Sequence, residues 1–268
     1  MLAAGLEDVQ YIPHGYNGDV YKPMDRAQAR EAWGVKPETF LAVVVAANKG
    51  NPSRKSLDRI LKAWGKFIEG KPDAVLYVHA LVTPQHGGFD LLAAAKHYGI
   101  PQENFRVPDM YRYVMGEYTW DGLAQLYNAA DVKVSPSMGE GFGITEIEAQ
   151  GCGCPVIVTG FSAQQELCFG GYTIPVDDFD DLTWTFQDSE QAFLRPSAIV
   201  NGLEWAWEHR GDAALRTLAV EGAREYEAAH VFETYMQPVL DHMADVNAQE
   251  KASKTEAEVV EPLEVVAV

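Results

Sequence analysis

Residues 137–159 read Ser-Met-Gly-Glu-Gly-Phe-Gly-Ile-Thr-Glu-Ile-Glu-Ala-Gln-Gly-Cys-Gly-Cys-Pro-Val-Ile-Val-Thr. The stretch places Glu140 and Glu148 eight positions apart across a glycine-containing turn. The apolar run Val132–Ser135 ahead of the turn predicts a short strand, and Ile144–Gln150 behind it predicts a helix. Strand, glycine loop and helix in this order build ligand sites in open α/β sheets, because helix N-termini present free N–H groups there.

The glycines and glutamates of this turn suit a phosphate- or sugar-bearing ligand. Gly141 and Gly143 let the backbone approach a pyrophosphate or sugar closely, since glycine has no side chain. Glu140 falls in the loop and Glu148 falls two turns into the helix, so their carboxylates can accept hydrogen bonds from hydroxyls at opposite ends of one extended ligand. The alternative is that Glu146 and Glu148 belong to a solvated helix face.

A second cluster is cationic. Lys49, Arg54 and Lys55 fall within seven positions of one glycine- and proline-containing loop. The 268-residue chain carries a formal net charge of −18, which argues against a nucleic-acid surface that tracks phosphates. Against that background, three cations in one loop indicate a local diphosphate site. A solvated turn followed by a helix that starts with Arg-Lys is the alternative.

Apolar runs alternate with amphipathic runs along the chain, which predicts an α/β fold with a parallel, doubly wound sheet. Apolar residues make up 47% of the sequence, enough to fill the core of one domain. The predicted strands are Phe40–Ala47, Ala74–Leu81, Phe105–Val107, Val132–Ser135, Val156–Thr159 and Tyr172–Ile174. The predicted helices are Arg54–Ile68, Phe89–Tyr98 and Asp121–Ala129, followed by a region of helices alone from Pro196 to Val246.

The run Ser137–Thr159 resembles the donor-site signature of retaining GT-B glycosyltransferases of the glycogen synthase and sucrose synthase type, the glycosyl transferases group 1. That signature is serine, two residues, EGFG, four residues, EA, and then a glycine and PV. Four other stretches resemble the same family in the same order, so that the resemblance covers about residues 9–243: the interdomain segment Tyr11–Asp19 with Tyr21 and Pro23, the basic loop Asn48–Lys55, the helix and strand Leu126–Val132, and the closing helix Tyr226–Leu240.

The resemblance implies a domain organisation. Residues 1–24 would be an interdomain-linker-like segment, and residues 25–246 a Rossmann-like domain, the second of the two in a GT-B fold. Residues 247–268 are expected to form a disordered tail, with a docking strand at Val265–Val268 as the alternative. The family's first domain, which mainly holds the acceptor, has no counterpart before the linker. We therefore expect a truncated chain or a separately encoded amino-terminal half.

The resemblance also implies a donor and roles for single residues. The donor would be a nucleoside diphosphate sugar, transferred with retention and without a metal to an unknown acceptor. Arg54 and Lys55 would hold the diphosphate, with Lys49 a weaker candidate. Glu140 would contact hydroxyls of the transferred sugar, and Glu148 would accept hydrogen bonds from the ribose. The remaining donor-binding positions, which would cover the sugar and the distal phosphate, are Gly141, Phe142, Gly143, Ile144 and Thr145.

Other positions are less distinctive. The base would lie near Met110–Tyr113, in a loop after the strand Phe105–Val107. The family's arginine after the first strand is not evident, because Ala46–Asn48 stands in its place. His14 in the linker motif and His79 in a strand run are both interpreted as structural.

The three cysteines predict free thiols in a reducing compartment and no zinc site, because Cys152 and Cys154 have neither a second cysteine pair nor a nearby histidine. No signal peptide and no long apolar run is evident. The sequence therefore predicts a cytoplasmic protein without a transmembrane segment.

Three functions remain open at this point. The leading one is the donor-binding half of a retaining, hexosyltransferase-type glycosyltransferase. The alternative is a non-catalytic or split-enzyme subunit that needs a separate amino-terminal acceptor domain, onto which Phe232, Tyr235 and Val239 would dock. A nucleotide-sugar epimerase is the third, and the EGFG signature speaks against it.

Overall fold

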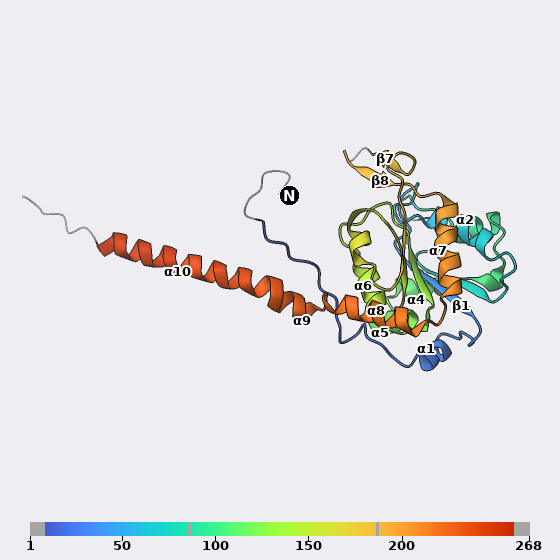
Figure 1. The fold of residues 1–268 in the computed structure, drawn as a ribbon, viewed down its shortest axis with the longest axis horizontal. Helices are drawn as coiled ribbons and strands as arrows, with labels where there is room; N and C mark the ends of the chain where they lie inside the picture. The colour runs from blue at the N-terminus through green and yellow to red at the C-terminus, as the bar shows by residue number, and fades with distance from the viewer. Residues whose placement is uncertain (1–8, 85–86, 186–187, 260–268) are drawn as a thin grey trace, which may run out of the picture.

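The computed structural model describes residues 9–84, 87–185 and 188–259 (Figure 1). A six-stranded parallel sheet forms its centre, in the order β3-β2-β1-β4-β5-β6. This is the strand order of a Rossmann-like fold, in which ligands bind beyond the carboxyl ends of the strands where the order reverses, here between β1 and β4. The strands are β1 (Phe40–Val45), β2 (Ala74–His79), β3 (Phe105–Arg106), β4 (Val132–Ser135), β5 (Val156–Thr159) and β6 (Tyr172–Ile174).

Helices cover both faces of the sheet, which confirms the doubly wound α/β prediction. Side chains alternate along a strand, so Phe40 and Val44 of β1 pack into the core on one face and Leu41 and Val43 into the core on the other. The first core is closed by α2 (Leu57–Phe67), α3 (Leu91–His97) and α7 (Pro196–Glu208); the second is closed by α1 (Arg26–Ala32), α5 (Trp120–Ala129), α6 (Ile144–Gly151) and α8 (Ala213–Arg224).

The predicted elements are confirmed, with shifted ends in several places. Strands β4, β5 and β6 have the predicted bounds. Helix α2 begins at Leu57 rather than Arg54, because residues 51–55 form turns and Ser56 adopts a left-handed conformation with φ 54°. The expected loop at Met110–Tyr113 was wrong. These residues form the short helix α4 (Met110–Val114), whose first turn is capped by the side chain of Asp109.

A two-stranded antiparallel hairpin, β7 (Leu182–Trp184) and β8 (Glu190–Ala192), was not predicted. It follows the carboxyl end of β6 and projects from the domain (Figure 1). Its base is tied to the loop after β4, since Ala192 N donates to Met138 O over 2.8 Å. The hairpin therefore lies at the ligand-binding edge of the sheet.

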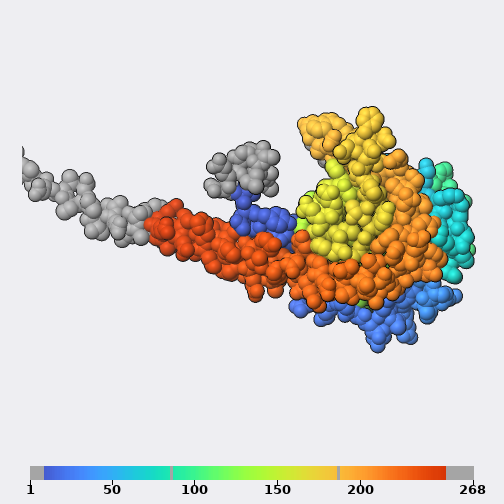
Figure 2. Space-filling model, in the orientation of Figure 1, coloured from blue at the N-terminus to red at the C-terminus, as the bar shows by residue number. Residues whose placement is uncertain are grey.

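The carboxyl-terminal third is helical, as predicted. It continues after α8 through α9 (Ala228–Val231), the π-helical turn η4 (Phe232–Met236) and α10 (Gln237–Val259), which extends away from the body of the domain (Figures 1 and 2). The expected tail was wrong over residues 247–259, which continue α10. Alanine, glutamate, lysine and glutamine dominate there and favour helix even without an apolar period. Residues 260–268, including the alternative docking strand, lie outside the described part.

The linker-like segment crosses the carboxyl-terminal helices. Tyr16 N donates to Tyr226 O and Ala228 N donates to Tyr16 O, each over 2.9 Å. The rings of Tyr11 and Tyr235 meet edge to face at 6.1 Å. These contacts hold the segment around His14 against the domain. Within the described residues, no helix has the length and apolar character needed to span a membrane.

Candidate functional site

Two loops meet at the carboxyl edge of the sheet, one after β1 and one after β4. Met138 N donates to Arg54 O over 2.8 Å, and Arg54 Nη1 donates to Gly139 O over 2.5 Å. The bond between Arg54 and Gly139 joins positions 85 residues apart in the sequence. The cationic loop and the glycine-containing turn therefore form one surface.

Glu140 is the centre of that surface. Its carboxylate accepts from Lys55 Nζ at 2.5 Å and pairs with Arg54 Nη1 at 3.0 Å, while its backbone N–H donates to Ser162 Oγ over 3.0 Å. Burial acts to raise the pKa of Glu140, but the hydrogen bond and charge of Lys55, together with Arg54, outweigh it and hold that pKa below its usual value. The carboxylate is therefore ionised and bound to two cations.

A pocket of about 330 Å³ opens beside this cluster. Gly143 precedes α6 with φ 117°, a conformation that favours glycine. The first N–H groups of a helix have no acceptor within it, so those of Ile144 and Thr145 stand free at the pocket and attract an anion. The residues that line the pocket are His14, Gly15, Lys55, Glu140, Phe142, Gly143, Ile144, Thr145 and Glu146.

The structure does not place every predicted residue in this pocket. Arg54 pairs with Glu140 but does not line the pocket. Lys49 and Gly141 are exposed and do not line it either. His14, interpreted as structural, lies on the wall with its ring 5.2 Å from that of Phe142. It belongs to the linker-like segment, so only the fold could bring it to the loop after β4.

Glu148 lies apart from the pocket lining, half-buried beneath the linker-like segment. The Tyr21 hydroxyl donates a hydrogen bond to its carboxylate. Burial raises the pKa of Glu148 to about 7, and Lys133 and Tyr21 offset this only in part. Its charge therefore changes close to neutral pH.

Glu146 was considered only as part of a solvated helix face, and that alternative is wrong. The side chain is fully buried, and its carboxylate accepts from Lys133 Nζ at 3.1 Å, from Gln164 Nε2 at 3.2 Å and from Ser135 Oγ. Burial opposes its ionisation, yet Lys133 and Ser135 bring its pKa down to about 2. A lysine inside the apolar run Val132–Ser135 was the sequence signal, because a buried ammonium needs a partner.

Helix α4 stands where the base was expected. Its Tyr113 ring lies 5.0 Å from His79, which also meets Tyr118 at 5.2 Å. Burial lowers the pKa of His79 to about 4, so the imidazole is neutral at pH 7 and packs as part of the core. The burial of His79 agrees with its structural interpretation. Tyr111, by contrast, is 72% exposed.

The three cysteines are free, and burial raises the pKa of each thiol. Over the described ranges, no three histidine, cysteine, aspartate or glutamate side chains converge as a metal site.

Comparison with known sequences gives one family model and several relatives. The model described as glycosyl transferases group 1 matches residues 42–188. The D-inositol 3-phosphate glycosyltransferase of Kribbella flavida is 30% identical over 217 residues, 77% of this chain and 50% of the relative. That of Mycobacterium sp. strain KMS is 31% identical over 225 residues, 81% of this chain and 43% of the relative. The chain thus spans half or less of these relatives' length.

Solved structures share the fold at low sequence identity. The C-terminal domain of a glycosyl transferase group 1 family protein (LpcC) from Francisella tularensis has a TM-score of 0.56 and 18% identity, covering 82% of this chain and 97% of that one. Anabaena Alr3699/HepE in complex with UDP has a TM-score of 0.63 and 16% identity, covering 91% of this chain and 60% of that one. The Francisella structure is a carboxyl-terminal domain alone, and the match covers nearly all of it.

Proposed function

The chain belongs to the glycosyl transferases group 1 family, and on that premise we propose that it is the donor-binding half of a retaining glycosyltransferase that uses a nucleoside diphosphate sugar. The observation that carries the proposal is the convergence of Arg54, Lys55 and Glu140 at the amino end of α6. Two cations and free helix N–H groups suit a diphosphate, and a carboxylate suits sugar hydroxyls. The UDP complex of the Anabaena structure, which has the same fold, agrees with such a donor.

The diphosphate would replace Glu140 as the partner of the two cations. Lys55 Nζ and Arg54 Nη1 now bind the Glu140 carboxylate, and Arg54 is half exposed. A doubly charged phosphate group competes well for such cations, because charge-assisted hydrogen bonds to phosphate are strong. When the bond to the sugar breaks, charge develops on the leaving diphosphate, and Lys55, Arg54 and the N–H groups of Ile144 and Thr145 stabilise it.

Glu140 would then turn to the hydroxyls of the transferred sugar, covered by Phe142 and Gly143. Glu148 would accept hydrogen bonds from the ribose, with Tyr21 keeping its carboxylate in place. The proposal assigns the diphosphate to cations of the chain and to no metal. The resemblance of residues 137–159 to retaining enzymes supports transfer of a hexosyl group with retention, and the three free cysteines support a cytoplasmic location.

Isothermal titration calorimetry of the full chain with UDP and GDP tests the donor site. We expect saturable binding of at least one nucleotide, unchanged in EDTA and weakened about tenfold or more in Glu148→Ala, since each such contact contributes about 1–3 kcal/mol. Glu69→Ala is the matched control, because Glu69 is 64% exposed and follows the carboxyl end of α2, away from the loops after β1 and β4. Absence of binding to either nucleotide by the unmodified chain would overturn the proposal.

The alternative, a subunit that acts only with a separate amino-terminal half, is favoured by the surface of η4 and α10. Of the three residues expected to dock, Phe232 is 47% exposed, whereas Tyr235 and Val239 are partly buried. Leu240 and Met243 of α10 are 43% and 55% exposed. Apolar residues grouped on a projecting helix indicate a docking surface. Co-purification with a second Rossmann-like chain, and transfer only in the mixture, would establish this alternative. Transfer by the isolated chain would exclude it.

A further inference from the structure

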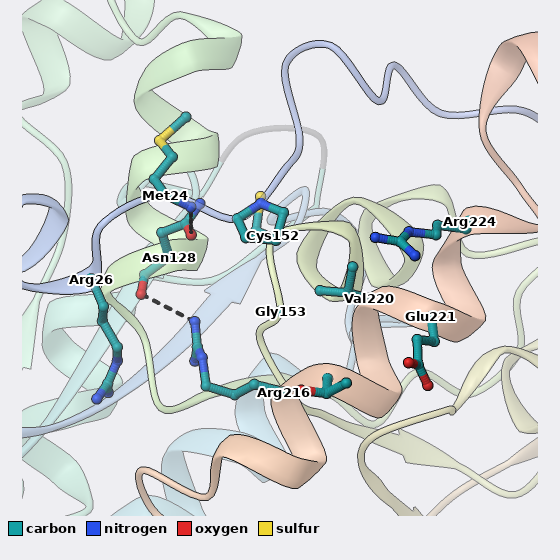
Figure 3. Close-up of a pocket in the computed structure, with 11 residues that line it drawn as sticks. Met24, Arg26, Asn128, Cys152, Gly153, Arg216, Val220, Glu221 and Arg224 are labelled. Atoms are coloured by element: carbon teal, nitrogen blue, oxygen red, sulfur yellow. Dashed lines mark hydrogen bonds between the residues drawn. The ribbon is translucent and has the colours of Figure 1, made fainter.

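A second cavity of about 330 Å³ lies at the other end of α6 (Figure 3). Its floor is Cys152 and Gly153, which end α6 and lead toward β5. One wall is the segment Pro23–Arg26 and the other is α8. Helix α6 has eight residues, so the two cavities are separated by roughly 12 Å along its axis.

Three guanidinium groups line this cavity. Arg26 comes from the start of α1, and Arg216 and Arg224 are two turns apart on one face of α8. In Figure 3 the Arg224 guanidinium lies above Val220, and the Arg26 guanidinium lies on the opposite side of the view and points away from it. Three cations in one concave site contrast with the net charge of −18 of the whole chain.

The nearby acceptors do not satisfy these cations. Asp131 binds Arg26 Nη2 at 2.6 Å, but it also pairs with Arg30 at 3.4 Å and accepts from Leu41 N. Arg26 Nε is buried and has no acceptor among the described residues. Each unpaired donor of this kind is costly, because it has lost its hydration without gaining a partner.

Arg216 and Arg224 also keep donors free. Arg216 donates to the carbonyl oxygens of Ala130 and Asn128 at 3.2 and 3.3 Å, which are neutral acceptors (Figure 3). Burial, together with the positive charge of Arg26, lowers the pKa of Arg216. Arg224 forms no ion pair within the described ranges, and Glu221 on the rim directs its carboxylate away from Arg216 in Figure 3.

We propose that this cavity binds a small molecule bearing a phosphate monoester, toward which the long side chains of Arg26, Arg216 and Arg224 turn when it binds. The planar guanidinium fork matches phosphate oxygens, and the volume suits a metabolite-sized ligand. The carboxyl end of α6 carries partial negative charge, which opposes an anion, so binding depends on the charges of the arginines. The net charge of −18 of the chain disfavours an anionic membrane as the source of the phosphate.

This site is separate from the donor site proposed above, and it does not depend on that proposal. The donor pocket uses the amino end of α6 and the loop around Lys55, and no residue lines both cavities. A ligand here would contact the segment Pro23–Arg26, which continues the linker-like segment that carries His14. Occupancy would therefore hold that segment against α8.

Calorimetric titration of the full chain with phenyl phosphate at low ionic strength tests the site. We expect saturable binding that Arg224→Ala weakens about tenfold, because Arg224 is exposed and its loss leaves the fold intact. Arg210→Ala removes an exposed arginine of the same charge outside the cavity and should bind like the unmodified chain. Lys55→Ala should also leave phenyl phosphate binding unchanged, while it weakens UDP binding.

Four outcomes would overturn the proposal. They are no binding of phenyl phosphate, equal affinity in Arg224→Ala and the unmodified chain, loss of binding in Lys55→Ala instead, and binding to phosphatidic acid vesicles without binding of phenyl phosphate. Thermal unfolding of each variant checks that a loss of affinity does not reflect loss of the fold. Failure of UDP to bind, with phenyl phosphate still bound, would contradict the donor site alone.

Discussion

Glu140 and Glu146 belong to the same turn and helix, and each pairs with a lysine, but the two ion pairs differ in access to solvent. The side chains of Arg54 and Lys55, which bind Glu140, are 50% and 22% exposed, whereas those of Lys133 and Glu146 are 0% and 1% exposed. A pair at the mouth of a pocket can exchange its partner for a ligand. A pair in the interior cannot, so it acts as part of the scaffold on which the first pair is carried.

The largest expected effect tests the buried pair. Glu146→Gln keeps the side-chain volume but leaves the Lys133 ammonium buried without a counter-charge, so the free energy of unfolding should fall by about 3–5 kcal/mol. Urea unfolding followed by circular dichroism at pH 7 measures it. The double variant Lys133→Met/Glu146→Leu should recover most of the loss, because apolar residues of similar volume can replace a buried pair. If the free energy of unfolding of Glu146→Gln changed by less than about 0.5 kcal/mol, the buried pair would contribute no more to stability than an exposed one.

The second prediction concerns the exposed ion pair, that of Lys55 with Glu140. Lys55→Ala should weaken UDP binding by about 1.5–3 kcal/mol, or roughly 10- to 150-fold, because it removes a charge-assisted contact to the diphosphate. Its free energy of unfolding should change little. Calorimetry and urea unfolding on the same preparation separate the two quantities, with Lys62→Ala, at an exposed lysine of α2, as the control. Equal losses of stability and affinity would mean that Lys55 belongs to the scaffold.

The third prediction uses Glu148, whose environment lies between the two extremes. Its pKa of about 7 means that the ionised form, which would accept ribose hydroxyls in the proposed donor site, becomes dominant above pH 7. UDP affinity should therefore rise by roughly three- to tenfold from pH 6 to pH 8. Glu148→Gln should lose this rise, which separates it from titration of the nucleotide itself. If UDP affinity changed equally with pH in the unmodified chain and in Glu148→Gln, Glu148 would not contact the ribose.

Glu148 also affects stability, with the opposite sign. The pKa of Glu148 in the folded protein lies above its ordinary value of 4.5, so the folded state binds the proton more tightly than the unfolded state. This contribution is fully present below about pH 4.5 and is lost as the pH rises through about 7. Affinity for the nucleotide and this part of the stability should thus change in opposite directions over the same interval.

The smallest expected effect is that of Glu140→Gln on stability. Its pairs with Arg54 and Lys55 are partly exposed, and such pairs contribute about 0–1 kcal/mol. UDP should bind at least as well as before, because the two cations no longer have an internal partner, whereas the extra affinity of a UDP-sugar over UDP should diminish. Comparing UDP with UDP-glucose on both proteins measures this. If Glu140→Gln lowered the free energy of unfolding by more than about 3 kcal/mol, Glu140 would be a structural residue like Glu146.

The sequence predicted the central sheet because its strands are short, apolar and bounded by turn residues. Val132–Ser135, Val156–Thr159 and Tyr172–Ile174 are strands with the predicted bounds. The pairing of the loops after β1 and β4 was also predictable, since parallel strands bring their carboxyl ends to one edge. That geometry is why Arg54, Lys55 and Glu140 meet.

Other features depend on contacts that no local pattern encodes. Glu146 and Glu148 are two positions apart on one helix, yet burial and neighbours give them a pKa of about 2 and of about 7. The arginine cavity joins α1 to α8 across about 190 residues of sequence, so its cations could not be grouped from spacing. The hairpin β7–β8 has only three residues in each strand, too few for a clear alternation.

The crossing of the linker-like segment with α9 has a consequence for engineering the chain. The backbone of Tyr16 forms hydrogen bonds with Tyr226 and with Ala228, and the ring of Tyr11 contacts that of Tyr235. The two ends of the domain therefore lie next to each other. A few residues joining Tyr235 to Tyr11 would close the polypeptide into a ring, and new ends cut at the exposed turn of Gly116 would give a circular permutant with the same sheet.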